Sequence, residues 1–463
     1  MGHQAQRSWR RWVAATVLGC LTAILFLFVS KSAEGLRDHE ERRSTPVAID
    51  GVTQTQHSVS SPLHRVSALA NRTAPGAEQI VRSKVARFGA MRREFARELA
   101  RRKGVTLSAD VDRFFDAVEK GDWEQVERTF KALNGGDSSA GFSGSRDPAL
   151  TWIWPAIIDA YGVAEQAHLW PAQQLLDYGN EILNALDPGM IYIGGTDSGR
   201  WIPALLSDTS DGERHVVLTQ NGLADATYLE YMRVQYEGRL ALLDEKDSAA
   251  AFEAYIADAR ERLAHDQQNP SAPKRVKPTE QLRLDEGNVH ISGVGAVMAI
   301  NEKLLQRLIA KNPELSFGLQ ESVPLPSTHA TGIPNGPIMH LNTRTADGAV
   351  AFTEDVANDS LAYWKERSAA AQLASTPKDS LSLFKSYSHH AAAAANLLAA
   401  RGFPKQAEQA YRLSSELWPE NPETTAHLSR LLEQQGRRSE AERLRQDFIT
   451  RHPSQREAFE KLR

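Results

Sequence analysis

Apolar side chains recur at three- and four-residue spacing over much of the chain, which is the period of amphipathic helices. Over residues 81–186 this pattern restarts at Ser108 and is interrupted by Gly121-Asp122 and by a Gly/Ser-rich stretch at 134–148, so we expect a helical region there. Its second half is rich in aromatic side chains, which at this spacing are typical of a packed core. A helical pattern returns at 346–387, where we expect a helical connector.

The centre of the chain changes to short apolar runs. Met190–Ile193 and Arg214–Gln220 are bounded by Gly, Pro and polar residues, as buried strands are, and a helical segment follows each. This alternation predicts βαβ units, and therefore a Rossmann-like α/β domain with a parallel or mixed sheet over residues 187–345. Three further runs complete the five expected strands: Val289–Ser292, Leu315–Leu319 and Ile338–Leu341.

The last part of the chain contains an internal repeat with a period of 34 residues. The repeated positions are Leu398, Gly402, Ala407 and Pro419, followed by Leu432, Gly436, Ala441 and Pro453. This period and order are those of the tetratricopeptide repeat, so we expect an all-α solenoid over residues 388–463. Because so short an array cannot bury its own face, we expect it to pack on the preceding domain or to bind a protein partner.

The N-terminus has the pattern of a membrane anchor. Residues 12–30 are 19 consecutive uncharged, mostly apolar positions, and a helix of this length spans about 28 Å, close to the thickness of a hydrocarbon core. Three arginines within residues 1–11 predict that this tail is cytoplasmic and that the body is extracytoplasmic or periplasmic. Residues 31–80 have the composition of a flexible linker. A cleaved signal peptide and a lipoprotein signal at Cys20 are the alternatives.

Charge and cysteine content exclude several classes of protein. The 463 residues contain 54 Lys and Arg against 58 Asp and Glu, so the net charge of −4 argues against a dedicated nucleic-acid binder. A single cysteine excludes an intramolecular disulfide and a multi-cysteine zinc site. Residues 82–103 hold nine basic and two acidic side chains. This segment is either a helix that lies on anionic lipid or a helix whose apolar stripe packs on the next one, and we favour packing.

Complete catalytic motifs are missing from the sequence. It contains no G-x-S-x-G, no H-E-x-x-H and no phosphate-binding P-loop. Gly293-Val-Gly295 lacks the third glycine of a dinucleotide fingerprint. The adjacent residues His389 and His390 point about 100° apart on a helix, which suits a metal poorly. We therefore expect no cofactor and no metal ion.

The best candidate site is the GGTDSGR segment, residues 194–200. It follows one expected strand and opens a helix, where ligands bind in parallel sheets, and its arginine and helix N-terminus suit a phosphate or a carboxylate. The end of the second expected strand lies on the same edge, and Glu321 is a weaker addition. The alternative is that the aspartates are only helix caps. The candidate ligand-binding residues are Gly194, Gly195, Thr196, Asp197, Ser198, Gly199, Arg200, Asn221 and Asp225.

Two long runs in this part of the chain resemble a known family. They are MIYIGGTDSGRWIPA at 190–204 and VVLTQNGLADATYLEYM at 216–232. Both are similar to bacterial single-pass membrane-anchored proteins with tetratricopeptide repeats, over about residues 85–450. That family is in turn similar to the extracytoplasmic portion of protein O-mannosyltransferase-like membrane proteins.

The resemblance implies an extracytoplasmic role beside an envelope glycan or protein glycosylation pathway, and it implies no catalytic residues. Glycosyltransferase activity does not follow, because this chain lacks the multi-span domain that carries it. Ser198 stands where the family has proline, and Gln320, Val323 and Pro326 replace an acid, an aromatic and a second acid. We expect an anchored binding or assembly module with a protein partner at the repeats. The alternative is an enzyme acting on a glycan or phosphate-bearing ligand at the GGTDSGR segment.

Overall fold

The structure is a computed structural model, and the predicted anchor at 12–30 lies outside the part of it that is described. So do Thr196, Asp197 and Glu321. No helix among the described residues is both long enough and apolar enough to cross a bilayer. The described residues are 76–135, 146–195, 198–277, 279–285, 288–320, 325–341, 344–345, 348–349, 351–374, 381–460 and 462.

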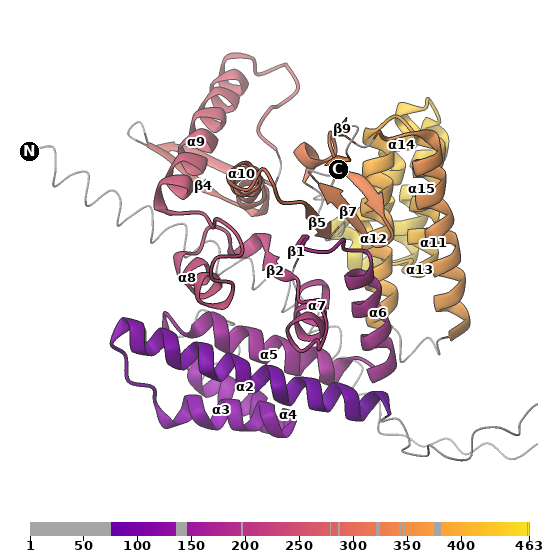
Figure 1. The fold of residues 1–463 in the computed structure, drawn as a ribbon. Coiled ribbons are helices and arrows are strands. Elements are labelled where there is room, and N and C mark those ends of the chain that lie inside the picture. Colours follow the sequence, from indigo (N-terminus) through magenta and orange to yellow (C-terminus); the bar gives the residue numbers. More distant parts are fainter. Residues whose placement is uncertain are drawn as a thin grey trace, which may run out of the picture.

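The N-terminal helices form a layer at one end of the molecule (Figure 1). Gly104 and Gly121, both with positive φ, follow the first two helices and end them. The apolar stripe of α2, which includes Phe88 and Leu99, is buried against α3 and α5. The helices of this layer are α2 (Ala77–Lys103), α3 (Ala109–Lys120), α4 (Trp123–Leu133) and α5 (Trp154–Leu169), and α6 (Ala172–Asn184) rises from it beside α7.

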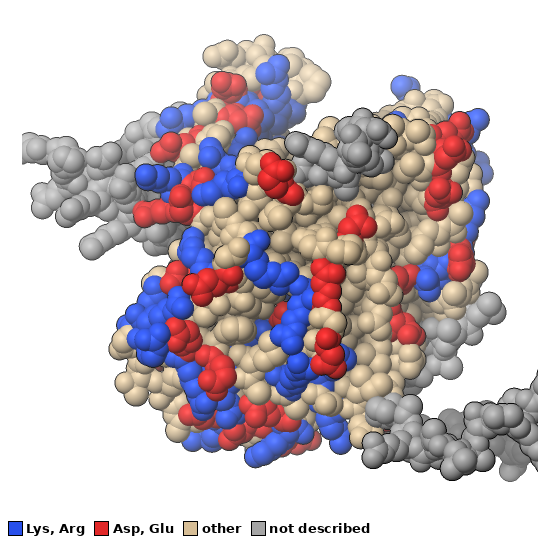
Figure 2. Space-filling model, in the orientation of Figure 1, with Lys and Arg blue, Asp and Glu red and all other residues tan. Residues whose placement is uncertain are grey.

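The charged side of α2 is balanced by acidic neighbours. Arg97 pairs with Glu94 at 2.8 Å, and Arg101 pairs with Glu98 at 2.7 Å. Figure 2 shows basic and acidic side chains interspersed over these helices. The basic segment therefore packs as a helix of the protein core, as the favoured interpretation of its sequence requires.

The sheet has five strands in the order β2-β1-β5-β7-β6. The central strand β1 is parallel to both β2 and β5, whereas β7 is antiparallel to β5 and β6. The helix α7 (Ser198–Asp208) connects β1 to β2. The strands are β1 (Ile191–Gly194), β2 (Val216–Thr219), β5 (Phe317–Gln320), β6 (Ile333–Asn335) and β7 (Ile338–Leu341).

The expectation of a Rossmann-like α/β fold is wrong. The described residues are predominantly helical, and the sheet is small and mixed, with strands of three or four residues. The expected strand Val289–Ser292 belongs to a separate hairpin, in which β4 (Asn288–Ser292) pairs with β3 (Gln281–Asp285). An apolar run shows that a strand is buried but not which strand it pairs with, so the antiparallel return after β5 was missed.

The remaining elements connect the sheet to the two helical parts. α9 and the β3–β4 hairpin stand together at one corner of the molecule, beside α10 (Figure 1). These elements are α8 (Ala226–Gln235), α9 (Glu245–Gln268), α10 (Val294–Lys311), β8 (Arg344–Thr345) and β9 (Gly348–Ala349), with short 3₁₀ turns at Pro148–Leu150, Gln220–Gly222, Pro326–Thr328 and Pro453–Gln455.

The C-terminal helices pack as successive neighbours, and the repeated positions have matching environments. Gly402 and Gly436 have φ of +86° and +80°, and Ala407 and Ala441 are fully buried. Membership of the tetratricopeptide class stays a prediction. The helices are α11 (Glu354–Ala374), α12 (Leu381–Ala400), α13 (Pro404–Leu417), α14 (Pro422–Gln434), α15 (Arg438–Arg451) and α16 (Arg456–Glu460).

Candidate functional site

The carboxyl ends of β1, β2 and β5 meet at one edge of the sheet, because these three strands are parallel. The register places Gly194 beside Thr219 and Ile193 beside Leu319. Gln320, the next residue of β5, is therefore level with Gly194. The GGTDSGR segment leaves the sheet between these two neighbouring strands, each about 5 Å away.

The glycines of the segment allow it to pack closely against β5. The Gly195 N–H donates to Gln320 Oε1 at 2.6 Å, and the Gly195 carbonyl accepts from Thr219 Oγ1 at 2.7 Å. A Cβ atom on Gly199, in the first turn of α7, would overlap the Gln320 side-chain amide. Gly195 and Gly199 thus bring the start of α7 against Gln320, and the space beside Gly199 is filled by protein.

Five neutral polar side chains lie around this packing point, and we call them the sheet-edge cluster: Tyr178, Ser198, Gln320, Ser386 and His390. His390 Nε2 lies 2.9 Å from Gln320 Nε2 and 3.3 Å from the Tyr178 hydroxyl. The hydroxyls of Ser198 and Ser386 are 3.0 Å apart, and both oppose the rise in the pKa of Tyr178 that burial causes. The serines are half-buried, whereas the other three side chains are buried.

His390 is neutral in this cluster, and one of its ring nitrogens has no hydrogen-bond partner among the described residues. Burial, assisted by His389, lowers the pKa of His390 to about 3. Because Gln320 Oε1 accepts from Gly195, its NH₂ group donates to His390 Nε2, and the ring proton then belongs on Nδ1. His390 Nδ1 is buried and has no hydrogen-bond partner among the described residues.

Arg200 does not reach the sheet edge. Its guanidinium pairs with the buried carboxylate of Asp159, which also accepts a hydrogen bond from the Tyr231 hydroxyl at 2.7 Å. Burial disfavours the charge of Arg200, but Asp159 and two tyrosines outweigh burial and raise its pKa. The side chain is 9% exposed. Its charge is therefore paired inside the protein and does not face a ligand at the sheet edge.

Asn221 and Asp225 also have partners of their own. Asp225 Oδ1 accepts from the backbone N–H groups of Thr227 and Tyr228 at 2.7 and 3.4 Å, which makes Asp225 the N-cap of α8. Asn221 Oδ1 accepts from Asn301 Nδ2 at 3.3 Å. Among the described residues, no hydrogen bond joins either side chain to the sheet-edge cluster. The structure brings Gly194, Gly195, Ser198 and Gly199 to the cluster, while Asn221, Asp225 and Arg200 lie elsewhere.

A second group of buried amides lies at the end of β2. Gln220 and Asn301 are fully buried. Both amide atoms of Gln220 and the Oδ1 of Asn301 lack hydrogen-bond partners within the described part of the chain. Buried polar atoms without a partner are uncommon, and water or a ligand usually satisfies them.

Three of these buried polar residues, Gln220, Gln320 and His390, are not among the site residues predicted from the sequence. The two glutamines could have been found from their position, since Gln320 ends the buried strand β5 and Gln220 directly follows the buried strand β2. His390 had no such signal, because its neighbours come from α6 and β5, which are distant in sequence.

The sheet-edge cluster suits recognition of a ligand through hydrogen bonds between uncharged groups. In the part of the chain that the structure describes, no three His, Cys, Asp or Glu side chains come together to hold a metal ion. The sheet-edge cluster offers hydroxyl, amide and imidazole groups, which pair with hydroxyl or amide groups of a ligand. This chain matches no known family model, no curated protein and no solved structure.

Proposed function

We propose that this protein binds a neutral, hydroxyl-rich ligand, such as a segment of a glycan, at the sheet-edge cluster. The unpaired Nδ1 of His390, buried among uncharged donors and acceptors, is the observation that carries the proposal. Nearly all buried polar groups have a hydrogen-bond partner. An oxygen atom of the ligand would supply the missing acceptor for this ring N–H.

The neutrality of the cluster favours a sugar over a phosphate. Sugar hydroxyls both donate and accept, and they match the hydroxyls of Ser198 and Ser386. A phosphate needs a cation to offset the cost of burying its charge. Arg200, the cation that the sequence offers for this purpose, is paired with Asp159.

An enzyme at the GGTDSGR segment is the second candidate, and the geometry supports it less. A nucleophilic serine needs a neighbouring base. His390 Nε2 contacts Gln320 and Tyr178, whereas Ser198 hydrogen-bonds Ser386. A pKa of about 3 also makes His390 a weak base near neutral pH. These contacts therefore favour a site that binds a ligand over a site that catalyses a reaction.

The proposal includes the membrane anchor that the sequence predicts. The apolar run at 12–30, with arginines before it, supports an anchored protein whose body is extracytoplasmic. A glycan-binding body in that location fits the resemblance to proteins beside envelope glycan pathways. The anchor and the location are parts of the proposal that a protease-protection experiment on intact cells would check.

Thermal unfolding of the full chain with a panel of saccharides tests the ligand class. Neutral oligosaccharides are compared with the same sugars carrying a phosphate. A ligand at one hundred times its Kd stabilises a protein by about 2.7 kcal/mol, which is a measurable rise in Tm. We expect a neutral sugar to raise Tm, and we expect Ser198→Ala combined with Ser386→Ala to abolish the rise.

The matched control is Ser415→Ala, on the half-buried surface of α13, which should respond as the wild type does. A shift given only by phosphorylated sugars would contradict the neutral-ligand proposal. A shift that survives both serine substitutions would place the ligand elsewhere.

A further inference from the structure

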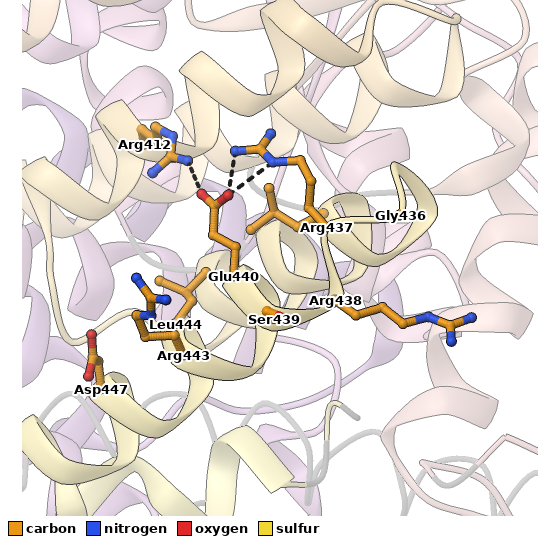
Figure 3. Close-up of a pocket in the computed structure, with 10 residues that line it drawn as sticks. Arg412, Gly436, Arg437, Arg438, Ser439, Glu440, Arg443, Leu444 and Asp447 are labelled. Carbon is orange, nitrogen blue, oxygen red and sulfur yellow. Dashed lines mark hydrogen bonds and ion pairs between the residues drawn. The ribbon is translucent and has the colours of Figure 1, made fainter.

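A cleft of about 570 Å³ opens on the C-terminal helices, between α13 and α15 (Figure 3). Arginines dominate its lining, and we call it the arginine-lined cleft. It shares no residue with the sheet-edge cluster. The charged side chains that line it are Arg412, Arg437, Arg438, Arg443, Glu440 and Asp447.

Two of these arginines are fixed by internal ion pairs. Glu440 is 2.9 Å from Arg412 and 2.8 Å from Arg437. Glu408 pairs with the same two arginines at 2.7 and 2.6 Å. Figure 3 shows Arg412 and Arg437 converging on Glu440 from two sides. These ion pairs hold the side chains on this side of the cleft in place, because bidentate arginine contacts restrict the conformations of both partners.

Arg438 and Arg443 are the positive charges left for a partner. Both are exposed, and neither forms an ion pair with another described residue. Arg438 is also the first residue of α15, where the helix dipole adds positive potential. The six charged residues of the lining, four positive and two negative, carry a net charge of +2.

The charge of the wider region has the same sign. Residues 381–463 contain 13 Lys and Arg against 10 Asp and Glu, a net +3. The whole chain is −4, so the other 380 residues carry −7. The C-terminal helices therefore carry a net charge that attracts an acidic partner.

We propose that the arginine-lined cleft binds an acidic peptide segment of a partner protein. Carboxylates match the planar guanidinium group of an arginine, and Arg438 and Arg443 each offer one at a separate point of the lining. Glu440 and Asp447 in the lining disfavour a dense polyanion such as nucleic acid, and they suit a peptide in which acids alternate with neutral residues. Leu444 in the same lining offers apolar contact to those neutral residues.

Fluorescence anisotropy with the full chain tests this proposal. The probe is a short labelled peptide of alternating Glu and Ala, and the reference peptide has Gln in place of each Glu. We expect the Glu peptide alone to bind. Because hydrogen bonds to charged groups are individually strong, Arg438→Gln combined with Arg443→Gln should weaken binding by about tenfold or more.

The matched control is Arg451→Gln combined with Arg456→Gln, which removes the same charge from exposed positions outside the cleft. It should bind within about twofold of the wild type. Equal weakening in both double variants would show that only net charge matters and would overturn the proposal. It is also overturned if the Glu peptide does not bind, if the Gln peptide binds equally, or if inorganic phosphate displaces the peptide at matched ionic strength.

Discussion

Arg92, Asp159, Arg200 and Asp208 form a buried ion network that joins α2, α5 and α7. Arg92 pairs with Asp208 at 2.5 Å and with Asp159 at 3.5 Å, and Asp159 also pairs with Arg200. Removing one member of a buried pair leaves the other without compensation, which costs far more than the pair itself contributes. At the scale of single residues, these four charges therefore contribute to the stability of the fold.

Arg200→Met tests the role of this network. We expect the free energy of unfolding to fall by about 3 kcal/mol, because Asp159 loses a buried cation. Urea denaturation followed by circular dichroism measures it. Arg102→Met, which removes an exposed ion pair with Glu98, should cost less than about 1 kcal/mol. If Arg200→Met left the free energy of unfolding unchanged, the guanidinium of Arg200 would not be held in an ion pair with Asp159.

His390 should make stability depend on pH. Burial holds its folded pKa near 3, below the value of about 6.5 in an unfolded chain. The unfolded state therefore binds the proton first as pH falls, so stability decreases from about pH 6.5 toward pH 3. In urea titrations, His390→Gln should flatten this dependence by up to about 1.4 kcal/mol per pH unit.

The control for this effect is the exposed histidine His168, replaced by Gln. Its pH profile should follow that of the wild type. Identical slopes for wild type and His390→Gln would show that His390 is not the group that titrates.

At the scale of elements, the start of α7 is fitted against the end of β5. Gly199 leaves room for the Gln320 amide, and the Gly195 N–H donates to the carbonyl oxygen of that amide. On the other side of α7, a Cβ on Gly162 of α5 would overlap the Trp201 ring. Both contacts need glycine because backbone and side chain approach too closely for a methyl group.

Gly199→Ala should therefore displace Gln320 and disturb the sheet-edge cluster. Overpacking of this kind costs about 1–3 kcal/mol. In the Gln320→Ala background the added methyl group has space, so the same change should be neutral, or stabilising by up to about 1 kcal/mol through helix propensity. A thermodynamic cycle of the four proteins measures the coupling.

The matched control is Gly212→Ala, in a bend where a Cβ would make only ordinary van der Waals contact. Its effect should be the same with and without Gln320. Additive effects of Gly199→Ala and Gln320→Ala would contradict the packing argument.

At the scale of the whole molecule, Glu181 connects α6 to the C-terminal helices. Its carboxylate accepts from the hydroxyls of Tyr363 in α11 and Tyr387 in α12, each at 2.6 Å, and pairs with Arg367. Figure 1 shows α6, which carries Glu181, beside α11 and α12. His390 of the sheet-edge cluster lies on α12, so this junction also positions the candidate site.

Glu181→Ala should loosen the junction without unfolding the N-terminal layer. The half-buried Tyr363 and the buried Tyr387 lose the acceptor of their hydroxyl groups, and a buried hydroxyl without a partner costs about 1–3 kcal/mol. Hydrogen exchange followed by mass spectrometry should show lower protection in α11 and α12, and unchanged protection in α2 and α3. Glu416→Ala, on the exposed side of α13, should leave the protection of all four helices unchanged. Uniform loss of protection would mean that the junction is not a separate unit.

The sequence by itself determined the local features of this protein. Helical periodicity located the N-terminal and C-terminal helices, and the glycines at 402 and 436 marked the turns because only glycine readily adopts positive φ. Short apolar runs located β1, β2, β5 and β7, and Asp225 had the position of a helix cap. These features depend on neighbours within a few residues, which a single sequence records directly.

Only the tertiary structure decided which residues meet. The mixed pairing of the sheet, the pairing of Arg200 with Asp159 and the joining of Gln320 to His390 all link segments that are far apart in sequence. Arg200 has the same chemistry as an anion-binding arginine, and its role depends on a carboxylate that arrives from α5. Electrostatic and hydrogen-bonding partners act over a few ångströms in space, so sequence spacing alone does not specify them.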